Sequence, residues 1–273
     1  MRRAFLLCIL FAATPLSALA QAASGTPLTG KLLITGSSTM APMIQELARR
    51  FRARHPGVAI AVEAGGSGRG VSDVLEGKAD IGMASRELAP KEQALFAIPM
   101  ARDGVVFVVH KGNPVGALTR AQAIEVFTGK ITNWRALGGH DARIEAVTRP
   151  DGRGSIELTA PYFGVASTAI RAAHVIGDNA DVVRLITANR NVIAFMSTGA
   201  VDNAVQKGLP LKPLVLDGFT PGVGSIRDGI WPLARPLNLL TRRVPTGAAR
   251  AFIEFALSPA AREVILQHDF VPY

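Results

Sequence analysis

The sequence predicts an α/β protein with two domains, each a mostly parallel sheet flanked by helices. Apolar, strand-like runs alternate with helical patterns along the chain, which is typical of parallel sheets. Three of these runs lead into turns rich in Gly, Ser and Thr, at residues 36–39, 65–70 and 152–155. A chain of 273 residues is long enough for two domains with separate cores.

The first predicted elements alternate regularly between strand and helix. A strand at 31–35 is followed by a helix that begins at Pro42 and ends near His55. The apolar residues of this helix recur with the helical period: Met43, Ile44, Leu47 and Phe51. Strands at 58–62 and 79–83, with a short helix at 71–76 between them, continue the alternation.

A second domain is expected after the break at Lys111-Gly-Asn-Pro114, which ends an apolar strand at 105–110. The elements that follow are a helix at 119–127, a strand at 144–148, a helix at 156–162, strands at 192–196 and 211–216, and a loop-rich stretch at 218–230. A strand at 232–241 then returns to the first domain, which helices at 246–257 and 259–268 complete. We therefore predict domain 1 at 31–110 plus 225–273, and domain 2 at 111–224.

Residues 1–20 have the features of a secretory signal peptide. Arg2 and Arg3 precede an apolar run, and Ala18-Leu-Ala20 supplies a small-x-small end. The apolar run is about half of the ~20 residues that a membrane-spanning helix needs. Cys8 is the only cysteine and follows a leucine, so we predict neither lipid attachment nor a disulfide. We expect cleavage after Ala20 and export to the periplasm.

The charge balance favours an anionic partner. The formal net charge is +9, from 30 Lys and Arg against 21 Asp and Glu. These basic residues are scattered, no nucleic-acid-binding motif is present, and only two Tyr and two Trp are available to stack on bases. We therefore predict no nucleic-acid partner and expect the ligand to be a small anion.

The three Gly/Ser/Thr turns share one chemistry. Each opens a predicted helix, where the first N–H groups have no internal partner and the helix dipole is positive. Glycine allows close approach of the backbone, and hydroxyls can donate to oxygen atoms. A single turn of this kind can be explained as ordinary helix capping. Three of them, each following a predicted strand, predict that the turns converge at the carboxyl ends of the strands, where open α/β sheets bind ligands. Arg149, directly before the third turn, can add a bidentate guanidinium fork.

Five segments, in consistent order from about Lys31 to Pro272, resemble the periplasmic phosphate-binding proteins of phosphate ABC transporters. They are Gly36-Ser-Ser-Thr-Met-Ala-Pro42, Gly65-Gly-Ser-Gly68, Asp80-Ile-Gly-Met-Ala-Ser-Arg86, Arg149-Pro-Asp-Gly-Arg-Gly-Ser155 and Trp231-Pro-Leu-Ala-Arg-Pro-Leu237. The resemblance implies a type II-like periplasmic-binding-protein fold, with two α/β domains joined by two crossing strands. It also implies that the anion is held in the cleft between them and delivered to an ABC permease in the inner membrane.

The resemblance also implies a set of ligand-binding residues. Arg149 would be the main charge partner, while Thr39 and Ser67 would donate hydroxyl and nearby N–H groups, joined by the N–H of Met40. Gly154 and Ser155 would close the cleft from the second domain. The full predicted set is Ser38, Thr39, Met40, Ser67, Gly68, Ser85, Arg86, Arg149, Arg153, Gly154 and Ser155.

Two positions depart from the pattern of this family. Arg153 stands where a serine that contacts phosphate is usual. Ser85-Arg86 stands where many members have a nearby aspartate, which accepts the proton of phosphate and helps to reject sulfate. If Arg86 and Arg153 face the cleft, they favour a fully charged anion. Phosphate is therefore the leading candidate, with sulfate or tungstate as alternatives.

Other classes of protein have less support. None of the five histidines has zinc-site spacing, and neither a Gly-x-Ser-x-Gly elbow nor a nucleotide phosphate-binding loop is present. We therefore predict a binding protein that is not an enzyme, has no metal or cofactor, and acts as a monomer. A sensor or adhesion module with the same fold remains an alternative to a transport role.

Overall fold

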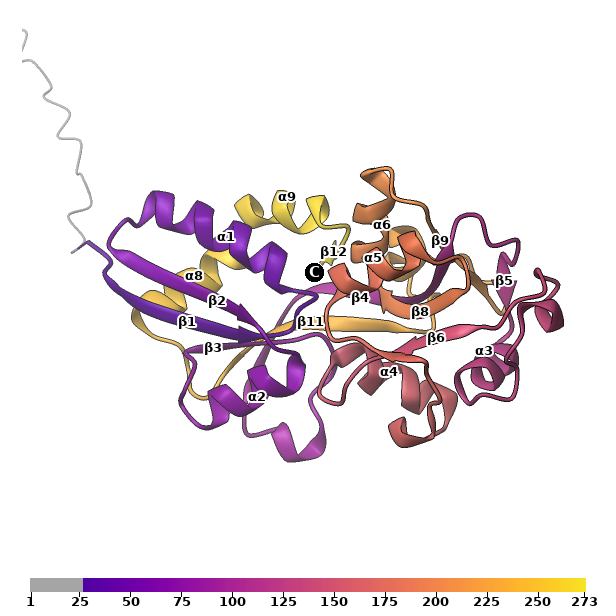
Figure 1. The fold of residues 1–273 in the computed structure, drawn as a ribbon. Helices are drawn as coiled ribbons and strands as arrows, with labels where there is room; N and C mark the ends of the chain where they lie inside the picture. The colour runs from indigo at the N-terminus through magenta and orange to yellow at the C-terminus, as the bar shows by residue number, and fades with distance from the viewer. Residues whose placement is uncertain (1–26) are drawn as a thin grey trace, which may run out of the picture.

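The computed structural model describes residues 27–273, so the predicted signal peptide lies outside the described range. The chain forms two lobes, and long strands run between them (Figure 1). No helix in the described range is long and apolar enough to cross a membrane.

The first lobe is built on three parallel strands. β1 (Gly30–Gly36) lies between β2 (Val58–Ala64) and β3 (Ile81–Ala84). The helices of this lobe cover both faces of the sheet, with α2 on the opposite side from the other three (Figure 1): α1 (Ala41–Arg54), α2 (Ser67–Leu75), α8 (Gly247–Ala256) and α9 (Pro259–Gln267). The predicted apolar face of α1 is confirmed, because all four of its residues are buried in the core of this lobe.

The second lobe repeats the plan with β6 (Glu145–Thr148), which pairs in parallel with β8 (Val192–Ser197) and β7 (His174–Val175). Its helices are α3 (Arg120–Phe127), α4 (Gly154–Phe163), α5 (Asn179–Ala188), α6 (Thr198–Gln206) and α7 (Val223–Arg227). In Figure 1, α4 lies on one side of this part of the sheet, and α5 and α6 lie on the other. Short 3-10 helices occur at Pro90–Glu92, Trp134–Leu137 and Ser167–Ala169.

Two antiparallel strands connect the lobes into one sheet. β4 (Phe96–His110) pairs with β11 (Ala234–Thr241) along its first part and with β8 and β9 (Leu211–Pro213) along its second part. The strand order is β2-β1-β3-β11-β4-β8-β6-β7. Three short strands complete the set: β12 (Val271–Pro272) pairs with β4, and β5 (Ala117–Leu118) pairs with β10 (Val215–Leu216).

The apolar side chains form a separate large cluster in each lobe. Residues 105–109 of β4 belong to the second cluster, together with Ile226, Trp231 and Leu233. The predicted boundaries at 110/111 and 224/225 had assigned these residues to the first domain. We place the crossings near Gly104 and Leu233 instead, because β4 changes partner there, from β11 to β8.

Several elements differ from their predicted bounds. β4 begins at Phe96 rather than near 105, since its backbone pairs with β11 from that residue on. The sequence did not indicate this first part of the strand because Pro99, Arg102 and Asp103 interrupt its apolar pattern. Helices α5 and α6 were not predicted, and α7 lies in the stretch predicted to be loop-rich. α6 follows β8 without an intervening turn, so no punctuation in the sequence separates the two.

The carboxylates of Asp202 in α6 and Asp269 in the C-terminal segment lie near each other. Gln206 donates from Nε2 to both carboxylate oxygens of Asp269, at 3.1 and 3.3 Å. Burial, and after it the nearby charges of Asp269 and Asp103, raise the pKa of Asp202 to about 6. The ionised form of Asp202 is therefore destabilising in the folded protein.

We predict that Asp202→Asn stabilises the protein at pH 7.5 and much less at pH 3.5. The folded state holds the Asp202 proton more tightly than the unfolded chain does, so the stability that this proton contributes is fully present below the ordinary pKa of 3.8 and is lost as the pH rises through the folded pKa of about 6. Because Asp202 is only partly buried, the expected gain is about 1 kcal/mol, a shift of a few degrees in Tm. Thermal unfolding at both pH values measures it, with exposed Asp228→Asn as the control. An equal change at both pH values would contradict the assignment.

Candidate functional site

A small polar cavity lies between the lobes and is lined by residues of both. The first lobe contributes Ser37, Ser38, Thr39, Gly66, Ser67 and Ser85, and the second contributes Arg149, Arg153, Gly154, Ser155, Gly177 and Asn179. Apart from glycine, every one of these residues carries a hydroxyl, an amide or a guanidinium group. None of the residues that line it within 27–273 is an Asp or a Glu.

The fold brings the three predicted turns together at this cavity. β1 leads into the turn before α1, α2 begins at Ser67, and β6 leads through Arg149 into α4. The first N–H groups of such helices are free to donate to an anion, and the positive ends of the helix dipoles favour negative charge. The cavity therefore lies where the turn chemistry predicted it.

Three buried serines of the first lobe form a hydroxyl network along the cavity wall. Ser37 Oγ donates to Ser85 Oγ at 2.9 Å, and the backbone N–H of Ser85 donates to Ser67 Oγ at 3.1 Å. The hydroxyls of Ser67 and Ser85 also lie within 3.3 Å of each other. These contacts fix the positions of three oxygens that can both donate to an anion and accept from one.

Arg149 is a buried cation without a charged partner. Its side chain is 3% exposed, and it donates only to neutral oxygens: the carbonyls of Phe195, Ile176 and Gly177, and Oδ1 of Asn179 at 2.6 Å. No carboxylate of residues 27–273 forms an ion pair with it. Burial, and after it the charges of Arg235 and Arg153, lower the pKa of Arg149 to about 10, against a smaller opposing effect of Asp178. A buried charge of this kind is costly unless an opposite charge joins it.

Arg153 lies at the same cavity and reaches across it. Its Nη1 donates to Ser38 Oγ of the first lobe at 2.9 Å and lies 3.1 Å from Oδ1 of Asp178. The guanidinium therefore spans the two lobes at the position where a serine is usual, and Asp178 balances part of its charge.

The two lobes touch through glycines. Gly68 N–H donates to the carbonyl of Gly152 at 2.9 Å, which joins the first lobe to the second. A Cβ on Gly66 would lie 2.8 Å from that same carbonyl, and a Cβ on Gly154 would lie 2.6 Å from Ser85 Oγ. Larger residues at these positions would hold the lobes apart, so the glycines allow the cavity to close.

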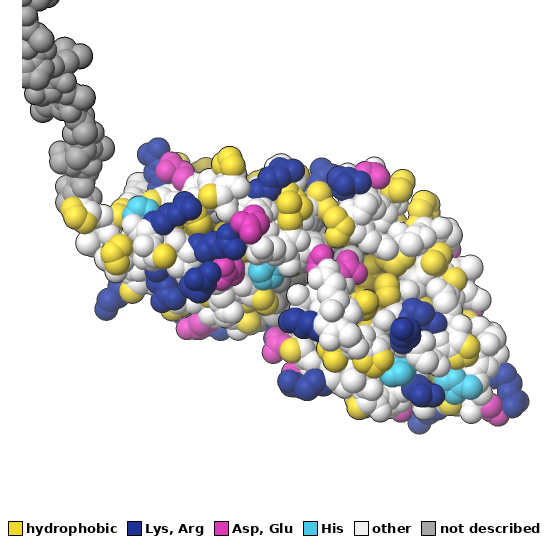
Figure 2. Space-filling view, turned by 90° about the horizontal axis from the view of Figure 1, so that it is seen from above, with side chains coloured by type: hydrophobic (Ala, Val, Ile, Leu, Met, Phe, Trp, Pro, Cys, Tyr) yellow, Lys and Arg dark blue, Asp and Glu magenta, His cyan; other side chains and the backbone are white. Residues whose placement is uncertain are grey.

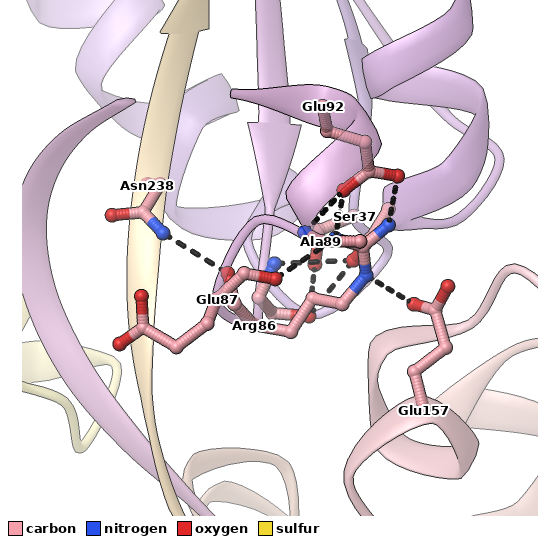
Figure 3. Close-up of polar contacts among 9 residues, drawn as sticks. Ser37, Arg86, Glu87, Ala89, Glu92, Glu157 and Asn238 are labelled. Atoms are coloured by element: carbon pink, nitrogen blue, oxygen red, sulfur yellow. Dashed lines mark hydrogen bonds and ion pairs between the residues drawn. The ribbon is translucent and has the colours of Figure 1, made fainter. Parts of the chain in front are cut away.

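Arg86 does not line the cavity, contrary to its predicted place in the site. Its guanidinium donates to both carboxylate oxygens of Glu92, at 2.6 and 2.9 Å, and through Nε to Glu157 of α4 at 2.6 Å (Figure 3). The side chain is thus occupied by two carboxylates, one of which belongs to the other lobe. This ion pair connects the lobes beside the cavity.

Two other predicted residues also lie outside the cavity lining. The N–H of Gly68 is engaged by Gly152, and the side chain of Met40 is buried in the core of the first lobe. Conversely, the cavity includes four residues that the sequence did not single out: Ser37, Gly66, Gly177 and Asn179. Gly177 lies just before α5, and Asn179 is its first residue. The Asp178-Asn179 pair is a helix-start signal that could have indicated this helix.

Comparison with known proteins identifies the family. A model described as a PBP superfamily domain matches residues 21–260. The chain belongs to the PBP superfamily. Among curated relatives of this PBP-superfamily chain is the phosphate-binding protein PstS of Bacillus subtilis, 28% identical over 250 residues, which cover 89% of this chain and 81% of that protein.

Solved structures agree with this assignment. A putative phosphate ABC transporter substrate-binding protein from Clostridium perfringens, solved with bound phosphate, aligns with a TM-score of 0.83 and 28% identity, over 89% of this chain and all of that one. An ABC-type phosphate transport receptor from Vibrio cholerae aligns with a TM-score of 0.69 and 29% identity, over 89% of this chain and 99% of that one. The predicted fold class, two α/β domains of the periplasmic-binding-protein type, is therefore confirmed.

We predict that Gly154→Ala prevents closure while leaving each lobe intact. The new methyl group would lie 2.6 Å from Ser85 Oγ, 2.8 Å from the Ser85 carbonyl and 2.9 Å from Ser67 Oγ, all across the cleft. Calorimetric titration should show anion affinity at least about tenfold weaker, with an unchanged Tm for the ligand-free protein. Gly224→Ala in α7, where a Cβ meets open space, is the control. Unchanged affinity would show that this contact is not needed for binding.

Proposed function

We propose that this protein captures inorganic phosphate between its two lobes and presents it to an ABC permease. The observation that carries the proposal is the buried guanidinium of Arg149, with which no carboxylate of residues 27–273 forms an ion pair. A small oxyanion in the adjoining cavity would supply the missing charge. Phosphate is favoured because the relatives are named phosphate-binding proteins and the Clostridium perfringens structure holds phosphate.

The geometry supports capture by a two-lobe clamp. In the open form, the anion would first meet the hydroxyls of Thr39 and Ser67 and the first N–H groups of α1 and α2. The second lobe would then close with Arg149 and with the first turn of α4 at Gly154 and Ser155. Charge-assisted hydrogen bonds in a site without bulk water are strong, and closure about the crossing strands encloses the ligand. The closed shape would be the form that the permease recognises.

We propose export and periplasmic action, with residues 1–20 removed as a signal peptide. The mature chain would be a monomer that needs neither metal nor cofactor, since hydroxyls, N–H groups and guanidinium groups are sufficient to hold an oxyanion. We propose binding rather than catalysis, because the cavity lining within 27–273 pairs no nucleophile with a histidine or carboxylate base.

Sulfate is the second candidate, and the composition of the cavity is the reason. Phosphate carries a proton that needs an acceptor, whereas sulfate has none. The lining residues within the described range offer no carboxylate for this proton, so the serine hydroxyl network would have to accept it. A hydrogen bond to a neutral acceptor is about half as strong as one to a carboxylate, so discrimination against sulfate should be smaller than with an aspartate.

Calorimetric titration tests the proposal directly. Mature protein, unfolded and refolded to remove bound ligand, is titrated with phosphate and with sulfate at pH 6 and pH 8. We expect phosphate to bind at least about tenfold more tightly than sulfate at both values, because only phosphate has a proton to donate to the serine hydroxyl network. Tighter binding of sulfate would reassign the ligand. Binding of neither anion would remove phosphate capture as the function.

We predict that Arg149→Ala weakens phosphate binding by more than about tenfold, because it removes the main positive charge of the site. Arg149→Lys should retain part of the affinity, since it keeps the charge but loses the fork. The control is Arg143→Ala, an exposed arginine just before the start of β6, whereas Arg149 directly follows its end. Calorimetry and thermal unfolding together measure affinity and folding. Normal binding by a folded Arg149→Ala variant would exclude Arg149 from the site.

A further inference from the structure

A second buried arginine lies on the strands that join the lobes. Arg235 of β11 and Asp103 of β4 are opposite each other in the antiparallel register. Nη2 and Nε of Arg235 both donate to Asp103 Oδ2, at 2.7 and 3.1 Å. Both residues are almost completely buried, at 3% and 0% exposure. The strand that carries Asp103 enters the second core at the next residues, so this ion pair lies at the crossing itself.

Arg235 also contacts the anion cavity, through Thr39. Its Nη2 donates to Thr39 Oγ1 at 3.2 Å. A guanidinium group can only donate, so the hydroxyl oxygen of Thr39 must be the acceptor. The hydroxyl proton is therefore directed away from Arg235. No residue in 27–273 accepts a hydrogen bond from this hydroxyl, and Thr39 lines the cavity.

The role of Arg235 differs from that of Arg149. Asp103 neutralises Arg235, whereas no carboxylate in the described part of the chain forms an ion pair with Arg149. Arg235 is nevertheless close enough to the cavity that its charge helps to lower the pKa of Arg149, after the larger effect of burial. Because the Asp103–Arg235 pair is neutral as a whole, it adds little net attraction for an anion. Its influence on the site comes mainly from how it orients the groups that it contacts.

We propose that Arg235, held by Asp103, is a positioning residue that aims the hydroxyl proton of Thr39 at the bound anion. This inference rests on the proposed function. The hydroxyl of Thr39, in the cavity-lining turn before α1, would thus be oriented from the crossing strands. Thr39 would be oriented before the second lobe closes, so less ordering would be needed when the anion arrives.

The test must separate positioning from simple structural support. Removing Arg235 alone would leave Asp103 buried and unpaired, which destabilises any fold. We therefore replace the whole pair, as Asp103→Leu with Arg235→Met. This pair variant is compared with Thr39→Val and with the triple variant. Thr35→Val, which removes a buried hydroxyl from β1 outside the cavity lining, is the matched control.

We expect Thr39→Val to weaken phosphate binding about tenfold, which is the effect of losing one hydrogen bond to a charged group. The pair variant should lose nearly as much, about fivefold, although neither Asp103 nor Arg235 lines the cavity itself. The triple variant should bind no more than about twofold more weakly than Thr39→Val alone, because both changes remove the same interaction. Thr35→Val should bind as the wild type does.

Two outcomes would overturn the inference. In the first, the losses multiply in the triple variant to about fiftyfold, which would make the pair and Thr39 independent. In the second, the folded pair variant binds phosphate normally. If the pair variant shows no cooperative unfolding, the cycle is repeated with Arg235→Lys, which keeps a cation for Asp103 but is too short to hold Thr39 in the same way. Failure of the wild type to bind phosphate would instead contradict the proposed function.

Discussion

The site of this protein is organised around one buried positive charge, with which no carboxylate of residues 27–273 forms an ion pair. Arg149 is enclosed by carbonyl and amide oxygens, and these satisfy its N–H groups without cancelling its charge. Neutral acceptors fix the plane of the guanidinium, while the positive potential remains available to a ligand. Burial is the main cause of the lowered pKa of Arg149, and the charges of Arg235 and Arg153 add to it. An anion that enters the cavity therefore relieves an existing electrostatic penalty.

The other arginines near the cleft are arranged differently. Arg86 binds Glu92 and Glu157, Arg235 binds Asp103, and Arg153 lies beside Asp178. Each of these ion pairs fixes a piece of structure: the contact between the lobes, the crossing strands, or the rim of the cavity. Basic residues are also distributed widely over the surface in the view of Figure 2, so the net charge is not concentrated at the cleft. In the proposed function, selectivity for a small anion would follow from Arg149, a buried cation that has no ion-pair partner within residues 27–273, and not from the overall excess of basic residues.

Closure of the cleft also depends on glycines in the interface, which have no side chains to hold the two lobes apart. Glycines 66, 68 and 154 allow backbone and hydroxyl groups of the two lobes to approach within hydrogen-bonding distance. The crossing strands β4 and β11 belong to one continuous sheet, so the lobes are joined by paired backbone rather than by a loose linker. A small relative rotation about these strands would open and close the cavity. The Arg86–Glu157 pair, at 2.6 Å, adds an electrostatic contact to the closed arrangement.

The sequence by itself determined the parallel strands, the three Gly/Ser/Thr turns and the place of Arg149 at the end of a strand. These features follow from local signals, namely apolar periodicity, helix-start residues and the carboxyl ends of strands. Only the tertiary structure decided which arginines of the described residues have carboxylate partners and which do not. Glu157 is 71 residues from Arg86, and Asp103 is 132 residues from Arg235, so no local pattern could reveal these partners. A charged side chain acts on a ligand only when nothing else satisfies it, and that depends on contacts between distant parts of the chain.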